Sequence, residues 1–153
     1  AILIAAACQV GAVLADANPE KENALREFGL EIGTAFQLMD DALDYVAEQK
    51  DFGKARGHDL EEGKMTLPLI HTYSVADVSE REEIARIIAL NELSEVDLER
   101  VCSLIDKYDG IKYTRMRAVE RIDLAKKQLE IFPQNEVRDA LYTLAEYVVA
   151  RNK

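Results

Sequence analysis

Residues 36–45, FQLMDDALDY, place Asp40, Asp41 and Asp44 within an otherwise mostly apolar run. Because an ionised carboxylate is costly to bury unless it is paired or bound to a metal, these side chains need a partner in any fold that encloses them. Apolar neighbours leave little of the helix circumference polar, which indicates a buried helix that carries acids. What satisfies these three charges is the main functional question.

The helix that carries the aspartates is expected to begin at Asn18-Pro19-Glu20. Asn18 can cap the helix, Pro19 suits its first turn, and Glu20 lies near the positive end of the helix dipole. No proline interrupts the chain between this point and Gln49. We therefore expect a helix of about 30 residues, roughly 45 Å long.

On such a helix the three aspartates share one sector, because Asp40 and Asp44 lie one turn apart and Asp41 and Asp44 are spaced i,i+3. Like charges at this spacing repel, and a divalent cation would reverse the effect. Carboxylate oxygens without a nearby His or Cys suit Mg²⁺, which commonly shares its coordination with waters and substrate phosphates. The pattern indicates a magnesium site for a phosphorylated substrate. The alternative is a short acidic patch on a solvated face.

Residues 48–64, EQKDFGKARGHDLEEGK, contain three glycines and no sustained apolar period, so they are expected to form a loop of functional length. Lys54 and Lys64 each follow a glycine. A mobile ammonium beside backbone that can approach closely suits phosphate oxygens. Thr66 can cap the next helix and Pro68 can occupy its first turn, which would place Lys64 beside a helix N-terminus that attracts anions. A solvated loop charge is the alternative for either lysine.

The composition bounds the class of protein. A chain of 153 residues with 48% hydrophobic content is expected to form one ordered domain, residues 1–153. A net charge of −10 argues against nucleic acid as a partner.

The apolar opening, residues 1–17, has no basic start and is too short to span a bilayer, so we expect a buried helix and no transmembrane segment. Cys8 and Cys102 lack metal-ligand spacing and indicate reduced thiols in a cytoplasmic protein.

The remaining sequence also favours helices, and no segment shows the alternation that a sheet needs, so the predicted class is all-α. Capping boxes are predicted at Ser79 with Glu82 and at Ser94 with Asp97. The next helix boundary is expected at 109–110, Asp-Gly.

Three glycines lie inside the first two predicted helices, and each is expected to allow a close approach between helices. They are Gly11, Gly29 and Gly33. Packing alone would account for Gly29 and Gly33.

These elements, in this order, resemble a known family. Residues 36–44, the Gly-Lys pair at 53–54 and residues 58–71, HDLEEGKMTLPLIH, are similar to the second aspartate-rich motif and the diphosphate-binding loop of the trans-isoprenyl diphosphate synthases. The TLPLI ending is most similar to the long-chain members, the octaprenyl, solanesyl and decaprenyl diphosphate synthases. The resemblance implies part of the isoprenoid-synthase helical bundle. It also implies Mg²⁺-dependent, head-to-tail condensation of isopentenyl diphosphate with an allylic diphosphate in isoprenoid and quinone side-chain biosynthesis.

The resemblance implies roles for individual positions. Asp40, Asp41 and Asp44 match the family's magnesium-binding carboxylates, with Asp40 expected as a direct ligand. Lys54 and Lys64 match its diphosphate-binding lysines. The aspartates and Lys54 are therefore the expected catalytic residues.

Two further positions, Phe36 and Gln37, match the FQ pair that lies against the substrates in this family. Homodimerisation is likewise implied by the resemblance alone. The family's first DDxxD motif has no counterpart in this sequence, so we expect the chain to be the C-terminal half of a synthase and to be inactive by itself. The alternatives are a noncatalytic helical partner subunit that retains one metal-diphosphate site, and a plain helical scaffold with an acidic patch.

Overall fold

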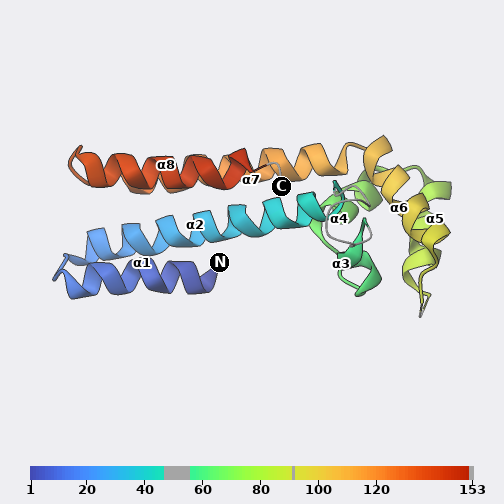
Figure 1. The fold of residues 1–153 in the computed structure, drawn as a ribbon, viewed down its shortest axis with the longest axis horizontal. Coiled ribbons are helices and arrows are strands. Elements are labelled where there is room, and N and C mark those ends of the chain that lie inside the picture. Colours follow the sequence, from blue (N-terminus) through green and yellow to red (C-terminus); the bar gives the residue numbers. More distant parts are fainter. Residues whose placement is uncertain (47–55, 91, 152–153) are drawn as a thin grey trace. The chain divides into compact units, whose positions relative to one another are not determined.

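The computed structural model describes residues 1–46, 56–90 and 92–151, and every regular element in these ranges is a helix. The helices are α1 (Ile2–Leu14), α2 (Pro19–Asp44), α3 (His58–Glu61), α4 (Leu67–Val75), α5 (Val78–Ile88), α6 (Glu95–Lys107), α7 (Gly110–Gln128) and α8 (Glu136–Ala150) (Figure 1). The predicted all-α class is confirmed. By their contacts, the described residues form two compact units, 1–39 with 116–151 and 40–115.

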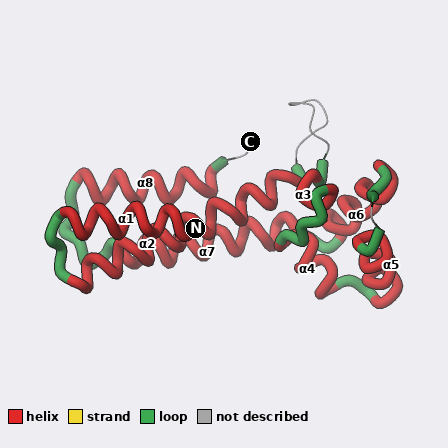
Figure 2. The backbone as a smooth tube through the Cα atoms, turned by 90° about the horizontal axis from the view of Figure 1, so that it is seen from below, coloured by secondary structure: helices red, strands yellow, loops and turns green. Residues whose placement is uncertain are grey.

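The first unit consists of α1, the first part of α2, the last part of α7 and α8, which lie side by side (Figure 2). The core of this unit comes from α2, α7 and α8. Its buried residues are Phe28, Ile32, Ala35, Met39, Ala118, Ile122, Ala125, Leu129, Ala145 and Val148.

Helix α1 packs closely on α2. The predicted close approach is confirmed at Gly29 and Gly33, two of the three glycines named from the sequence. A Cβ atom on Gly29 would lie 2.7 Å from the carbonyl oxygen of Ile4 and 2.8 Å from Cα of Ala5. A Cβ on Gly33 would lie 2.5 Å from Cα of Ala1. The prediction was wrong for Gly11, because in the described structure no atom beyond its chain neighbours and its own helix backbone lies within 4 Å of the place where its Cβ would be.

The expectation that the apolar opening forms a buried helix was wrong for most of its surface. Only Ala5 and Ala12 are buried in α1, because one narrow face of small residues packs on α2. Its large side chains remain exposed in the described structure. They are Ile2, Leu3, Val10, Val13 and Leu14. No helix in the described ranges has the length and apolar character needed to cross a bilayer.

Helix α2 begins as predicted but ends earlier than expected. The side chain of Asn18 accepts a hydrogen bond from the backbone N–H of Lys21 at 2.9 Å. At the other end, the helix stops at Asp44 rather than at Gln49. The returning chain supplies donors to the last carbonyl groups there, because Gly57 N–H donates to the Asp44 carbonyl oxygen at 3.1 Å. Residues 47–49 lie outside the described ranges.

The second unit packs the short helices α3 to α6 with the end of α2 and the start of α7. Its buried core residues are Tyr45, Leu60, Leu69, Ala76, Ile84, Ile87, Leu98, Val101, Cys102, Leu104 and Ile105. Gly57, which has a φ of 82°, is buried against this core, and a Cβ there would lie 3.4 Å from Sγ of Cys102. The left-handed backbone of Gly57 is readily accessible only to glycine.

The helix starts of the second unit test the predicted caps. Ser94 and Asp97 form the predicted capping box. The box at Ser79 was wrong, since Asp77 caps α5 by accepting from the N–H of Glu80 at 2.9 Å. Thr66 does occupy the cap position of α4, but its side chain makes no capping hydrogen bond.

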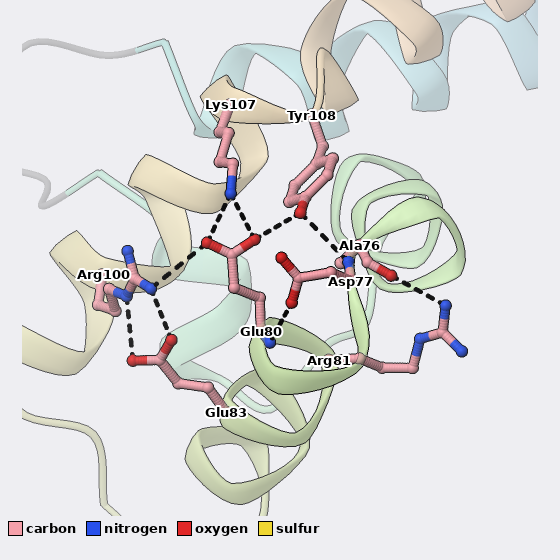
Figure 3. Close-up of polar contacts among 8 residues, drawn as sticks. All are labelled: Ala76, Asp77, Glu80, Arg81, Glu83, Arg100, Lys107 and Tyr108. Carbon is pink, nitrogen blue, oxygen red and sulfur yellow. Dashed lines mark hydrogen bonds and ion pairs between the residues drawn. The ribbon is translucent and has the colours of Figure 1, made fainter.

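A network of charges joins α5 to α6 in this unit (Figure 3). Glu80 accepts hydrogen bonds from Lys107 Nζ at 2.7 and 2.6 Å, and from the Tyr108 hydroxyl. Arg100 binds Glu83 through two nitrogen–oxygen contacts of 3.0 and 2.6 Å. These contacts join α5 to α6 within the second unit.

Candidate functional site

The C-terminal end of α2 and the residues around α3 form the candidate site. Asp44 Oδ2 accepts a hydrogen bond from the backbone N–H of Asp59 at 3.1 Å. The carboxylate of Asp59 in turn lies 3.1 Å from Lys64 Nζ. The structure thus connects Asp44 on the predicted metal-binding helix to the predicted diphosphate-binding lysine through one residue.

The three aspartates differ in exposure. Asp40 is exposed, whereas Asp41 and Asp44 are half-buried. Burial, together with the neighbouring charges of Asp59, Asp40 and Asp44, raises the pKa of Asp41 to about 6, and Lys64 opposes the shift. Burial also raises the pKa of Asp44, against the effect of the hydrogen bond from Asp59 N–H. Negative charge is therefore concentrated where a cation would relieve it.

Lys64 is exposed and lies among acids. Its Nζ is 3.1 Å from Asp59 Oδ1 and 2.6 Å from Glu62 Oε2. Hydrogen bonds from its ammonium group to Glu62 and Asp59 raise its pKa, so it remains protonated. Because 57% of the side chain is exposed, this ammonium can leave its surface ion pairs for a more highly charged anion at small cost.

The other predicted site residues are distributed as follows. Phe36 and Gln37 lie on α2 within the first unit, where the Arg151 guanidinium sits 4.2 Å from the centroid of the Phe36 ring. Gln37 Oε1 accepts a hydrogen bond from the amino group of Ala1 at 3.2 Å. Lys54 lies outside the described residues. The structure brings together the aspartates and Lys64, whereas Phe36 and Gln37 are linked to them through the continuous helix α2.

The donor chemistry of the site fits magnesium. Asp40, Asp41, Asp44 and Asp59 offer carboxylate oxygens and no nitrogen or sulfur, which is the ligand set that a hard cation prefers. Burial and, after it, repulsion from the neighbouring carboxylates raise the pKa of Asp41, and a bound cation would favour its ionised form. In the part of the chain that the structure describes, no three His, Cys, Asp or Glu side chains converge tightly enough to hold an ion already. The metal-ligand assignment stays a prediction.

Reasoning from the sequence assigned no role to Asp59 or Arg56. Asp59 lies in the HDLEEGK segment. Its position between Lys54 and Lys64 was the only feature of the sequence that could have suggested a role in the site. Arg56 had no local signal, since its partner Asp106 lies 50 residues further along the chain. Both residues contact the end of α2 or its side chains.

Comparison with known proteins identifies the family. A model of the polyprenyl synthetase family matches residues 1–105. The chain belongs to the polyprenyl synthetase family. The predicted resemblance is confirmed at this level, and the all-helical fold agrees with it.

Individual relatives within the polyprenyl synthetase family show both the likeness and its extent. Octaprenyl diphosphate synthase from Escherichia coli is 38% identical over 151 residues, which are 99% of this chain and 46% of that relative. Short chain isoprenyl diphosphate synthase from Methanothermobacter thermautotrophicus is 33% identical over 151 residues, again 99% of this chain and 46% of the relative. The chain therefore spans about half the length of the curated relatives it matches.

Among solved structures, polyprenyl synthase from Caulobacter crescentus superposes with a TM-score of 0.89 at 41% identity, over 99% of this chain and 46% of that one. That protein was crystallised with calcium and isoprenyl diphosphate. Calcium, like magnesium, is a hard cation that prefers oxygen ligands.

Proposed function

We propose that this chain provides one magnesium and diphosphate site of a long-chain polyprenyl diphosphate synthase, which condenses isopentenyl diphosphate with an allylic diphosphate. The observation that carries the proposal is the connection from Asp44 through Asp59 to Lys64, with contacts of 3.1 and 3.1 Å. This contact between carboxylates suited to a cation and an ammonium suited to a phosphate supports the proposed site. Family membership and the similarity to octaprenyl diphosphate synthase support the choice of reaction.

In this proposal the carboxylates of Asp40, Asp41 and Asp44 hold Mg²⁺. Bound Mg²⁺ would supply positive charge that stabilises a departing diphosphate. Lys64 donates to the diphosphate oxygens after leaving Asp59 and Glu62. Lys54 shares this role.

The remaining parts of the proposal concern the apolar end of the substrate and the assembly. Phe36 and Gln37 contact the substrates, and the partly exposed Phe36 ring offers an apolar surface to an isoprenyl chain. We infer one polyprenyl synthetase domain that includes residues 1–153. The exposed side chains of α1 support association with more protein, and we propose a homodimer. Both cysteines are free thiols, which supports a cytoplasmic location.

The proposal is tested by titrating the chain with inorganic pyrophosphate, with and without magnesium, in a calorimeter. We expect magnesium-dependent binding that Asp40→Ala weakens by about tenfold or more, because losing a carboxylate ligand removes much of the metal affinity. Asp40 is exposed, so the fold should persist. Asp123→Ala, which removes an exposed helical aspartate in the first unit, is the matched control. Binding that is indifferent to magnesium or to Asp40→Ala would exclude the proposed site.

A further inference from the structure

The chain returns to the end of α2 through Arg56, whose guanidinium has two different partners. Its Nε donates to the backbone carbonyl oxygen of Tyr45, directly after the last residue of α2. Its Nη2 lies 2.8 and 2.7 Å from the two carboxylate oxygens of Asp106 on α6. One side chain therefore connects the end of the aspartate helix to a second helix of the same unit.

Three groups of the returning chain contact the end of the helix, at Asp44 and Tyr45. Arg56 binds the Tyr45 carbonyl, Gly57 N–H donates to the Asp44 carbonyl at 3.1 Å, and Asp59 N–H donates to the Asp44 carboxylate at 3.1 Å. The last carbonyls of a helix have no partner within the helix, so Arg56 and Gly57 satisfy backbone groups that would otherwise need water, while Asp59 N–H holds the Asp44 side chain. Arg56 is the member of this set that reaches outside the segment, to Asp106.

We propose that Arg56 is a positioning residue for the magnesium and diphosphate site, acting through Asp106 to fix the end of α2 and with it the Asp44 carboxylate. The inference rests on the proposed function for the identity of the ligand. Arg56 does not need to contact that ligand, because its guanidinium already donates to the Tyr45 carbonyl and the Asp106 carboxylate. A planar guanidinium can donate to both at once, whereas a lysine ammonium lacks this fork geometry.

The structure offers a closely matched ion pair as a control. Arg100 also binds a carboxylate through two contacts, of 3.0 and 2.6 Å to Glu83 on α5, within the same unit. The two arginine side chains have similar exposure, 36% for Arg56 and 41% for Arg100. Within the described residues, the ion pairs of Arg100 are to Glu80 and Glu83, both on α5. Removing Arg100 should therefore cost a similar ion pair and leave the site unchanged.

The first measurement requires no ligand. Amide hydrogen exchange at Gly57 and Asp59 should accelerate by about tenfold in Arg56→Ala, because a lost charged hydrogen bond is worth at least that factor in local opening. Arg100→Ala should leave these two amides unchanged. Asp106→Asn, which keeps the shape of the side chain, should reproduce the effect if the Arg56 variant does not fold. Unchanged exchange in Arg56→Ala, or in Asp106→Asn where that variant alone folds, would overturn the inference.

The second measurement is magnesium-dependent binding of inorganic pyrophosphate. We expect Arg56→Ala to bind about tenfold more weakly, Arg56→Lys to fall between it and the wild type, and Arg100→Ala to bind normally. The double variant Arg56→Ala/Asp106→Ala should bind no more weakly than Arg56→Ala, since the two residues act as one unit. Normal binding by Arg56→Ala would overturn the inference. If the wild type itself does not bind, or if Asp40→Ala binds as tightly as the wild type, the proposed function is wrong, and the exchange data still decide whether Arg56 fixes the end of α2.

Discussion

Asp59 donates its backbone N–H to the Asp44 carboxylate over 3.1 Å. Its own carboxylate points to Lys64 and raises the pKa of Asp41 by charge repulsion. Asp59 thus orients one predicted metal ligand through its backbone, while its side chain adds negative charge near another. These two roles can be separated, because a substitution changes the side chain and keeps the N–H group.

Asp59→Asn should lower the pKa of Asp41 from its value of about 6. A negative neighbour disfavours ionisation, so removing one makes the carboxylate easier to form. The measurement is an NMR titration of the Asp41 carboxyl carbon. Glu120→Gln, on α7 outside this unit, is the control for a general loss of negative charge. It should leave the pKa of Asp41 unchanged. A pKa of Asp41 that does not fall in Asp59→Asn would contradict the electrostatic description of the site.

Lys64→Gln should weaken magnesium-dependent binding of pyrophosphate by about tenfold, because a hydrogen bond to a charged group is lost. Stability should change little, since the ion pairs of Lys64 are largely exposed. Lys112→Gln removes another exposed lysine of the same unit and serves as the comparison in the same titration. Equal affinities for the two variants would remove Lys64 from the site.

Gly29→Ala should destabilise the protein by about 1–3 kcal/mol, as overpacking of a close contact typically does. The new methyl group would meet backbone atoms of Ile4 and Ala5 that cannot rotate away. Gly11→Ala provides the opposite case on α1, where the space is open, and should stabilise by about 0.5–1 kcal/mol through helix propensity. Urea unfolding of both variants measures the difference, and a stable Gly29→Ala would show that α1 is not held against α2.

Acid should destabilise the second unit through Glu80. Hydrogen bonds from Lys107 and Tyr108 hold the pKa of the Glu80 carboxyl below its usual value. A lowered folded-state pKa gives stability that is present above the unfolded-state pKa and is lost as pH falls through the folded-state value. Urea unfolding between about pH 3 and pH 7 should therefore show a smaller loss of stability for Glu80→Gln than for the wild type.

Glu82→Gln, an exposed neighbour on α5, is the control for this acid dependence and should keep the wild-type profile. Lys107 shows the opposite behaviour, since its raised pKa gives stability that is lost only at alkaline pH. An identical acid profile for Glu80→Gln and the wild type would mean that the network in Figure 3 does not contribute to folding.

The chain alone should not catalyse prenyl transfer, even where it binds magnesium and pyrophosphate. It carries one aspartate-rich motif and spans 46% of its octaprenyl diphosphate synthase relative. Incubation with magnesium, isopentenyl diphosphate and an allylic diphosphate, followed by product analysis, measures this directly. Sustained magnesium-dependent turnover would show that a single aspartate-rich motif is sufficient.

Local signals in the sequence predicted the helices and several of their ends. Asn18 and the Ser94–Asp97 pair were recognisable because a cap depends on residues three positions apart. The same rule failed at Ser79, since Asp77 also satisfies it and lies closer to where α4 ends. A capping pattern of four residues cannot decide which of two candidates, two positions apart, begins the helix.

Contacts between distant segments were beyond such reasoning. Arg56 and Gly57, which return from further along the chain, contact the end of α2, and the absence of proline up to Gln49 gave no sign that the helix ends at Asp44. The pair of Arg56 and Asp106 spans 50 residues, so no local spacing rule could indicate it. The aspartates and Lys64 were predicted as site residues because chemistry and family resemblance point to the same positions, and their roles stay predictions.

The burial of Cys102 has a practical consequence. Its side chain lies in the core beneath Gly57, with 2% of the residue exposed, whereas Cys8 is only half-buried. Burial raises the pKa of both thiols, so access decides which one reacts. An alkylating reagent should modify Cys8 first and reach Cys102 only when the packing under Gly57 opens. The rate of that second modification would report how often this packing opens, with a cysteine that the chain already carries.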